Sequence, residues 1–380
     1  MRITINTGTF ATEVAWLARL LPSRIAVPVL AGVHLATGEG SVRLTVYDYE
    51  TSGTVDVDAH VSEPGTVLVS GRALATIAAL LPEGADAHLA VDGPRLTVTA
   101  GDAKFTLPTL PIEDYPTVPA PGEEIGRVDA ETFSAAVGQV IAAVSTDATL
   151  PMICAVQLRL GERLSLAGTD RYRIAQRRMP WNPTMEAGDA DALLLVPPRT
   201  LHYAARTLSA DDHIGLGVQR DGDGGHVSGV TLSDGHRTVS TRLIAADPPT
   251  IERLFAGAAA PVVTATVNVE RLRSAARRAG ALCTAVTPVV LDIQDDHITV
   301  EGGDGDAGGR DVVPAVTDGQ PHTVAVRHGY LLDCLDALVT EQARLLVPAD
   351  HKPLRILPDT GEDAETAGYR YLLMPVRRGD

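Results

Sequence analysis

The chain has 380 residues, which is long for a single hydrophobic core and predicts two or three domains. Hydrophobic residues make up 45% of it and charged residues 21%, so a disordered chain is excluded. The formal net charge of −16 excludes a uniformly basic nucleic-acid binder, but not an acidic protein with one basic surface.

Amphipathic periodicity predicts six helices in chain order, at residues 9–21, 70–81, 129–144, 197–209, 268–283 and 327–339. They form three pairs. After the first helix of each pair come an X-Pro dipeptide with an apolar strand, and then a second strand that ends near an aspartate. A short Val-rich strand precedes the second helix. The prolines are Pro28, Pro151 and Pro288, and the aspartates are Asp48, Asp170 and Asp304.

This threefold repeat predicts three homologous α+β domains, each with two helices packed on antiparallel sheets. We expect the domains at residues 1–122, 127–256 and 262–380, joined by the segments TVPAPGEE and AGAAAP. Each repeated proline suits the first position of a strand, where no backbone donor is needed.

The predicted helices carry more arginine than acid, while the rest of the chain is strongly acidic. The helix at 268–283 has the most basic face, with Arg271, Arg273, Arg277 and Arg278, and an apolar face that we expect to meet a sheet, with Leu272, Ala276, Ala279 and Leu282. This imbalance predicts a surface that contacts phosphate groups. Ordinary solvated helix surfaces remain an equal alternative.

Residue patterns favour neither catalysis nor metal binding. Cys154, Cys283 and Cys334 are far apart and form no CxxC pair, which argues against disulfides and zinc. The Gly- and Asp-rich stretches at 221–226 and 302–309 lack calcium-loop spacing, so we interpret them as turns. No signal peptide or membrane-length apolar run is evident. We therefore expect a soluble cytoplasmic protein that is not an enzyme and has no cofactor, metal or membrane partner.

Five motifs occur in order at family spacing on this repeat: VPVLAG at 27–32, FTLPTLPIEDYP at 105–116, LPMI at 150–153, TDRYRIA at 169–175 and YLLMPVR at 371–377. With them the chain resembles the bacterial DNA polymerase III beta subunit, the sliding clamp, most of all in its actinobacterial form. The resemblance implies a head-to-tail homodimer, a ring of six domains around double-stranded DNA. Such a clamp is a processivity factor that slides because phosphate contacts carry no sequence information.

The resemblance also implies a peptide pocket between the second and third domains. Its partners would be the replicative polymerase alpha subunit, the clamp loader, repair polymerases and other proteins whose short peptides carry a Gln and hydrophobic anchors. ATP belongs to the loader, so no cofactor is implied. The pocket residues would be Ile153, Thr169, Asp170, Arg171, Tyr172, Arg173, Ile174, Pro249, Arg253, Leu254, Tyr330, Leu372, Leu373, Met374, Pro375, Val376 and Arg377. The alternative for YLLMPVR is a buried final strand, and both can hold together.

By the same resemblance, Arg24, Arg72 and Arg199 would contact DNA with the four arginines of the 268–283 helix. A solvated surface arginine is the alternative for each of them. Phe105 and Leu107 would form the apolar edge of the subunit interface, or else ordinary alternation within a core.

The sequence departs from the family at several of these places. Arg327, followed by His328, stands where many clamps have Asn beside the pocket. Asp147 lies where some members place a polar DNA contact, and Gly280-Ala281 is smaller than the usual interface pair. The last four residues, Arg-Arg-Gly-Asp, replace a usual Arg-Leu close. These changes suit a specialised second clamp, for example one whose pocket evades an inhibitor. A peptide-docking scaffold that no longer loads onto DNA is the other alternative.

Overall fold

The computed structural model describes residues 1–22, 27–184, 192–208, 211–222, 225–284, 287–304, 307–349, 352–361 and 368–376. The chain forms two compact units, each treated by itself below. Unit 1 consists of residues 1–131, 182–185 and 203–243, and unit 2 consists of residues 132–181, 186–202 and 244–380. Neither unit coincides with one of the three domains expected from the sequence, and the boundaries of those domains stay a prediction.

All six predicted helices are confirmed, each slightly shorter than expected, and a seventh, α5, was missed. The helices of the described chain are α1 (Thr7–Ala18), α2 (Gly71–Ala78), α3 (Ala130–Ile141), α4 (Pro198–Thr207), α5 (Ile251–Ala256), α6 (Val269–Ala279) and α7 (His328–Ala337). Short polar side chains fix several starts. Asn6 accepts bonds from two amides of α1, and Asn268 accepts one from the Arg271 amide of α6.

Unit 1 contains two antiparallel sheets. The first has the order β5 (His60–Glu63), β1 (Arg2–Asn6), β7 (Asp86–Asp92), β8 (Arg95–Ala100) and β9 (Ala103–Pro108). The second has the order β14 (Asn182–Pro183), β10 (Glu123–Asp129), β16 (His213–Arg220), β17 (Val227–Ser233), β18 (Arg237–Arg242), β4 (Thr51–Asp58), β3 (Ser41–Tyr47), β2 (Gly32–Thr37) and β6 (Thr66–Ser70). Pairing of β18 with β4 joins two expected domains in one sheet.

Unit 2 contains one long antiparallel sheet of twelve described strands. Its order is β15 (Leu193–Val196), β11 (Val156–Arg159), β12 (Leu164–Thr169), β13 (Arg173–Met179), β26 (Tyr369–Leu373), β25 (Leu354–Pro358), β24 (Gln342–Pro348), β19 (Pro261–Asn268), β22 (Ala307–Gly319), β21 (His297–Asp304), β20 (Pro288–Ile293) and β23 (His322–Arg327). Here β13 pairs with β26, so the second and third expected domains also share a sheet.

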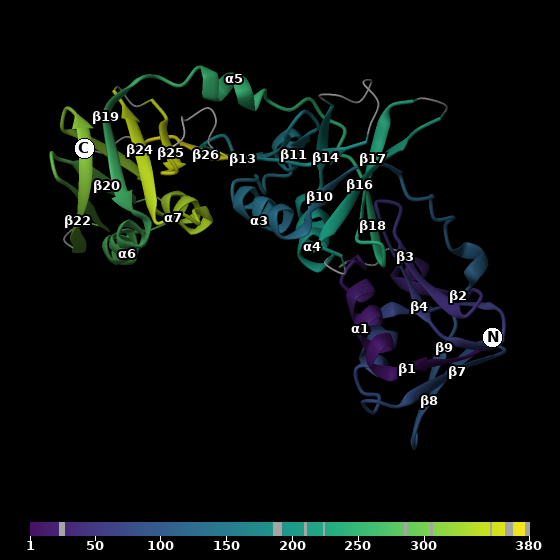
Figure 1. Ribbon diagram of the computed structural model, residues 1–380. Coiled ribbons are helices and arrows are strands. Elements are labelled where there is room, and N and C mark those ends of the chain that lie inside the picture. The colour runs from purple at the N-terminus through teal and green to yellow at the C-terminus, as the bar shows by residue number, and fades with distance from the viewer. Residues whose placement is uncertain are drawn as a thin grey trace. The chain divides into compact units, whose positions relative to one another are not determined.

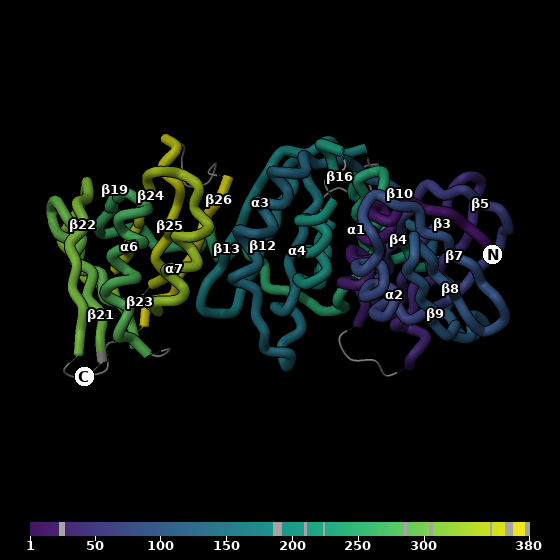
Figure 2. Tube along the Cα trace, turned by 90° about the horizontal axis from the view of Figure 1, so that it is seen from below, coloured from purple at the N-terminus to yellow at the C-terminus, as the bar shows by residue number. Residues whose placement is uncertain are grey.

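Each unit packs a pair of helices against its strands, which confirms the predicted α+β fold. Figures 1 and 2 show α6 and α7 side by side on the strands of unit 2, and α1 and α2 are neighbours in unit 1. The apolar faces fill the cores, with Phe10 and Leu17 of α1 and Leu272 and Ala276 of α6 fully buried. Burial of these faces, more than intrinsic helix propensity, stabilises such short helices.

Several sequence-based expectations were wrong in detail. Pro28 and Pro151 begin short 3₁₀ turns and not strands, because proline suits the first position of a helical turn equally well; Pro288 does begin β20. Leu282 does not face the sheet. The α-helix ends at Ala279, a 3₁₀ turn follows, and Leu282 is 52% exposed. The stretch at 302–309 is a hairpin of β21 and β22, of which residues 305 and 306 lie outside the description.

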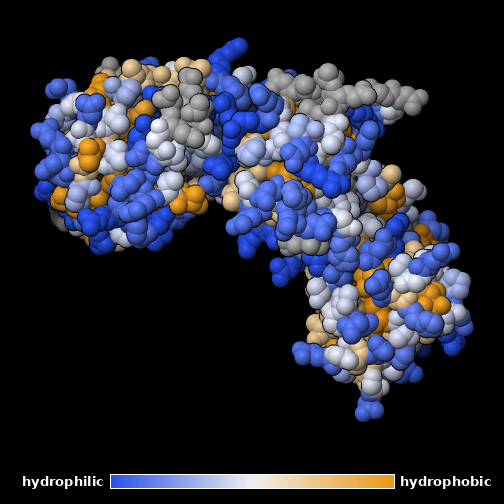
Figure 3. Space-filling model, in the orientation of Figure 1, coloured by the Kyte–Doolittle hydropathy of each residue, from blue (hydrophilic) through white to orange (hydrophobic). Residues whose placement is uncertain are grey.

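The face of the molecule seen in Figure 3 is mainly hydrophilic, with scattered hydrophobic patches. In the described part of the chain, no helix has the length and apolar character needed to cross a membrane.

Candidate functional site

A tight turn between β12 and β13 carries the centre of the TDRYR motif. The Asp170 carboxylate accepts hydrogen bonds from the amides of Tyr172 (3.0 Å) and Arg173 (3.1 Å), and the Thr169 hydroxyl donates to the Arg173 carbonyl (2.8 Å). Arg171 has a φ of 79°, which usually belongs to glycine. A non-glycine residue held in this region is strained, and such strain gathers at functional sites.

The C-terminal strand brings distant residues to this turn. In the β13–β26 ladder Arg173 lies opposite Leu373, and Ile174 lies opposite Leu372. Beyond the strand, the Met374 amide donates to the Tyr172 carbonyl (2.8 Å), and the Val376 amide donates to the Ala325 carbonyl (2.8 Å). The final described residues are therefore fixed along one side of the turn. The interpretation of YLLMPVR as a buried final strand fits β26, because Leu372 and Leu373 are buried. Met374 is exposed, and its place in a peptide pocket stays a prediction.

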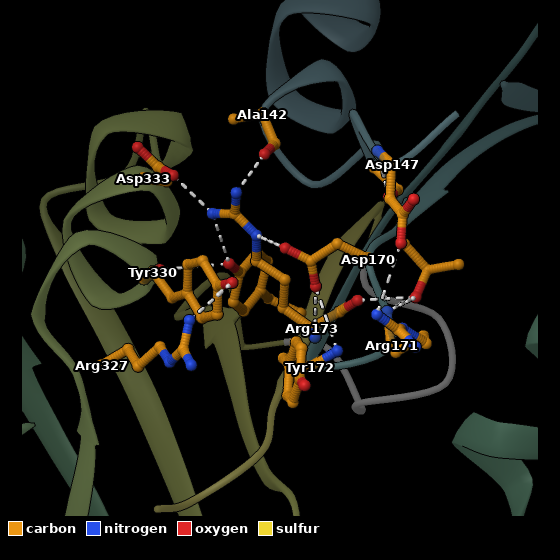
Figure 4. A network of polar contacts seen from close by, with 12 residues as sticks. Ala142, Asp147, Asp170, Arg171, Tyr172, Arg173, Arg327, Tyr330 and Asp333 are labelled. Carbon is orange, nitrogen blue, oxygen red and sulfur yellow. Dashed lines mark hydrogen bonds and ion pairs between the residues drawn. The ribbon is translucent and has the colours of Figure 1, made fainter. Parts of the chain in front are cut away.

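Arg173 links this turn to α7 and α3. Only 8% of the residue is exposed, and its guanidinium donates to the Asp170 carboxylate (2.9 Å), to the Asp333 carboxylate of α7 and to the Ala142 carbonyl (Figure 4). It also lies over the Tyr330 ring, 4.2 Å from the centroid. Because a buried charge is stable only when it is paired and hydrogen-bonded, we interpret Arg173 as the structural anchor of the site.

The anchor remains charged at every physiological pH. Burial by itself lowers the pKa of Arg173, but Tyr371, Asp333 and Asp170 outweigh it and raise that pKa above its usual range. Beneath it, burial raises the pKa of Cys334 and of Tyr371 well above their ordinary values, so both side chains are neutral. These two buried side chains are therefore not activated nucleophiles.

Two aromatic rings and a second arginine form the open side of the site. The rings of Tyr172 and Tyr330 are stacked with centroids 6.5 Å apart. The guanidinium of Arg327 lies 5.1 Å from the Tyr172 centroid and 5.4 Å from the Tyr330 centroid. The Tyr371 hydroxyl donates to the Tyr330 carbonyl (3.1 Å) and so fixes the start of α7. Figure 4 shows Arg327 approaching from the α7 side.

An apolar cluster lies beside the turn. Ile174 and Leu372 pack with Ala167, Ile251 and Phe255, so the missed helix α5 contributes two of its members. Leu254, which precedes Phe255 on α5, is exposed, and so is Met374. Exposed aliphatic and thioether groups beside a buried apolar floor are suited to bind hydrophobic side chains of a ligand.

The remaining predicted pocket residues have different surroundings. Ile153 is buried in a 3₁₀ turn, Arg253 is exposed on α5, and the Pro249 carbonyl accepts from the Gln157 side chain (3.3 Å). Pro375 is partly exposed, and Arg377 lies outside the described residues. Sequence reasoning missed Asp333 and the Ala142 carbonyl as partners of Arg173, and no motif in the sequence marks either.

Known proteins resemble the whole chain. Family models match the N-terminal domain of the DNA polymerase III beta subunit over residues 1–119 and its central domain over residues 127–250. The Beta sliding clamp of Streptomyces coelicolor is 38% identical over 380 residues and covers 99% of each chain. The chain belongs to the beta sliding clamp family. The predicted actinobacterial resemblance and the prediction of a sliding clamp are thereby confirmed.

Two further relatives of this clamp are informative. The Beta sliding clamp homolog GriR of Streptomyces muensis is 32% identical over 380 residues, again covering 99% of each chain. Among solved structures, the Pseudomonas aeruginosa clamp bound to griselimycin aligns with a TM-score of 0.89 and 22% identity over 99% of each chain. This structural likeness shows the shared fold.

A second turn of the clamp repeats the anchor. Between β17 and β18, the Asp234 carboxylate accepts from the amides of His236 and Arg237, as Asp170 does in unit 2. The Arg237 guanidinium makes two 2.8 Å bonds to the Glu13 carboxylate of α1 and lies 5.1 Å from the Trp16 centroid. Thus each unit has an Asp-x-x-Arg turn whose arginine reaches a carboxylate and an aromatic ring on a helix.

The arginines of α6 are less free than their sequence suggests. Arg273 pairs with Asp336 of α7 (2.9 Å) and with Glu270, Arg277 pairs with Asp336 (3.1 Å), and Arg278 pairs with Asp311 of β22 (2.5 Å). Arg271 is exposed, and no ion pair to it is found within the described residues. These neighbouring acids reduce the positive potential of the helix.

The other predicted DNA contacts lie on separate helices. Arg72 is exposed on α2 and donates to the Pro22 carbonyl (2.9 Å), while Arg199 is exposed in the first turn of α4. Arg24 lies outside the described residues.

The predicted interface residues lie on β9, the last strand of its sheet. Leu107 is buried and belongs to the core, whereas Phe105 is half-buried, so part of its ring is accessible for contact with another chain. At the other expected contact, Gly280 packs against His328, because a Cβ built on Gly280 would lie 2.2 Å from the imidazole Nε2. These two departures from the family pattern therefore compensate each other.

A cavity of about 770 Å³ lies elsewhere, in unit 1, between the outer sheet face and the segment at 112–121. It is lined by hydroxyl groups such as Thr45, Thr54 and Thr238, and by His34 and Tyr115. Arg43 and Asp56 also line it, but they form an ion pair with each other, so their charges cancel. Nothing in its lining points to a particular ligand.

Proposed function

We propose that this protein is a DNA sliding clamp that encircles double-stranded DNA as a head-to-tail homodimer and tethers clamp-binding proteins through the pocket on unit 2. The single observation that carries this proposal is the full-length 38% identity to the Streptomyces coelicolor Beta sliding clamp. The protein is a non-catalytic accessory subunit that works in the cytoplasm, where a bacterial chromosome lies. We take its partners to be the replicative polymerase alpha subunit, the clamp loader and repair polymerases.

The pocket supports the tethering role. A rigid turn, a buried apolar cluster and two exposed hydrophobic side chains are prearranged around a fixed arginine. A preformed site loses little conformational entropy when a short peptide binds to it. The three expected domain boundaries, at residues 1–122, 127–256 and 262–380, would place this pocket between the second and third domains.

Free strand edges support the homodimer. Among the strands that the structure describes, β9 has a partner on one side only. The first half of β22 likewise pairs only with β21, because β19 pairs with the segment from Ala315 onward. Antiparallel pairing of β9 of one subunit with β22 of the next would satisfy both edges. Such a head-to-tail contact closes into a ring when its rotation closes. Phe105 and the exposed Val312 would lie at this contact.

Retention on circular DNA tests the proposal. The protein is incubated with a cognate clamp loader, ATP and nicked circular DNA, and the isolated complex is then linearised with a restriction enzyme. A clamp stays on the circle and is lost from the linear form. Retention on both forms would mean ordinary electrostatic binding. Failure to load, while another clamp loads beside it, would favour a docking scaffold.

A specialised second clamp is the other candidate, and Arg327 favours it. The guanidinium of this residue lies beside the stacked rings of Tyr172 and Tyr330 at the proposed rim of the pocket, and the GriR homolog is a full-length relative. The griselimycin-bound relative makes that compound a suitable probe. If Arg327 excludes inhibitors, Arg327→Asn should bind griselimycin at least roughly tenfold more tightly than the unaltered chain, a difference of about 1.4 kcal/mol. Equal affinities, or a genome with no other clamp gene, would eliminate this candidate.

A further inference from the structure

Charges around the pocket are unevenly matched. Arg173 is paired with Asp170 and Asp333, and Arg171 lies 3.8 Å from the Asp147 carboxylate. Arg327 has no carboxylate within ion-pair distance in the part of the chain that the structure describes. It is half-buried, so water reaches only part of its guanidinium. Beside Tyr172 and Tyr330, the charge of Arg327 is therefore not balanced by a described neighbour, in a protein whose overall charge is −16.

The aromatic contacts hold this cation without using its strongest donors. A guanidinium near the face of a tyrosine ring is attracted to the π electrons, and its N–H groups remain available in its own plane. The centroid distances of 5.1 Å and 5.4 Å lie within the range of this attraction. Its hydrogen bond to the Tyr330 hydroxyl is long, at 3.4 Å. Most of the five N–H donors of Arg327 therefore remain for a ligand.

The surroundings fix the position of Arg327. It is the N-cap residue of α7, with extended backbone angles and no capping hydrogen bond from its side chain. The backbones that carry the two rings are fixed, because the Tyr371 hydroxyl donates to the Tyr330 carbonyl and the Met374 amide donates to the Tyr172 carbonyl. The first turn of α7 contains no acidic residue, so the positive end of the helix dipole adds to the charge of Arg327. A carboxylate at this place would meet a prearranged positive site.

We propose that Arg327 makes the pocket select peptides that carry an aspartate or glutamate beside their hydrophobic anchors. The inference rests on the proposed peptide-tethering function and adds the chemistry of the partner to it. The carboxylate accepts two N–H bonds from the planar guanidinium, a geometry that asparagine cannot match because it offers one neutral acceptor oxygen. The neighbouring rings exclude water from one side of the contact and so strengthen it.

Matched peptides test this selectivity. Fluorescein-labelled nonapeptides carry one Gln, a Leu and a Phe as anchors, and Ser at the other positions; each Ser in turn is replaced by Asp or by Asn. Fluorescence anisotropy gives the affinity for the full chain, for Arg327→Met and for the control Arg206→Met, which removes an exposed arginine of α4. Thermal melting checks that each variant folds. Arg327→Lys keeps the charge and removes the planar fork.

The expected result is a preference of roughly tenfold for Asp over Asn at one peptide position, which is the size of one charge-assisted hydrogen bond. Arg327→Met should reduce it to less than about twofold, Arg327→Lys should retain part of it, and Arg206→Met should leave it unchanged. Raising the salt concentration should diminish it. Equal binding of Asp and Asn peptides at every position, or an unchanged preference in Arg327→Met, overturns the inference while leaving the tethering pocket intact. Absence of binding by every peptide overturns the pocket itself.

Discussion

Replacing the buried anchor of the pocket, Arg173→Met, gives the sharpest test of the site. The side chain of Arg173 is 9% exposed and contacts Asp170, Asp333 and the Ala142 carbonyl. Removing one partner of a buried ion pair costs about 3–5 kcal/mol, because the other charge is left without compensation. Asp170 is only 13% exposed, but Asp333 is 42% exposed and can be rehydrated. We therefore expect the lower end of this range, about 3 kcal/mol.

Urea unfolding monitored by circular dichroism measures this loss. With a denaturant dependence of about 3 kcal/mol per molar, the midpoint of the unit 2 transition should fall by about 1 M. Asp333→Asn should cost only about 1 kcal/mol, because a partly exposed hydrogen-bond partner remains. Peptide affinity, measured in parallel, should fall for Arg173→Met, because the turn and the start of α7 are no longer held together.

Arg237→Met is the matched control. It removes the equivalent arginine of the unit 1 turn and leaves Glu13, which is only 6% exposed, without its partner. We expect a loss of about 3–5 kcal/mol in unit 1 with peptide affinity unchanged. If Arg173→Met unfolds at the same urea concentration as the unaltered chain, or if both variants weaken peptide binding equally, Arg173 is not the anchor of the pocket.

Three other perturbations have defined outcomes. Replacing Arg271, Arg273, Arg277 and Arg278 with Glu should abolish retention on circular DNA and leave peptide binding intact; unchanged retention would remove α6 from the DNA surface. The single change Arg271→Ala should reduce the magnitude of the slope of log DNA affinity against log salt concentration by about 1. Phe105→Arg should give monomers in sedimentation velocity with little change in melting temperature, because Phe105 is only half-buried at a sheet edge; a stable dimer would contradict the interface. Burial lowers the pKa of His34 below 6.5, so the unfolded chain binds more protons and stability falls as the pH drops through that value. His34→Gln should therefore flatten the plot of melting temperature against pH between about pH 5 and 6.5, and an identical slope would show that His34 does not cause the pH dependence.

Local signals in the sequence determined most of the secondary structure. Apolar periodicity marks the faces of α1 and α6 that are buried, and Asn6 and Asn268 precede them as caps. These effects act within a few residues, so they can be read along the chain. The missed helix α5 has only six residues, too short to show a period. The sequence also predicts a strand that ends near Asp170, and β12 does end at Thr169, the residue before it.

The polar contacts of the proposed pocket were decided only by the tertiary structure. Arg173 meets Asp333 across 160 residues of sequence, and pairing of β13 with β26 brings them together. The same applies to Arg278, which the sequence predicts as a phosphate-binding residue but which pairs with Asp311 of β22. Charge interactions depend on distance in space and on exposure to water, and neither is a property of sequence position. Composition could therefore indicate a basic helix, but only packing decides how much of that charge remains for DNA.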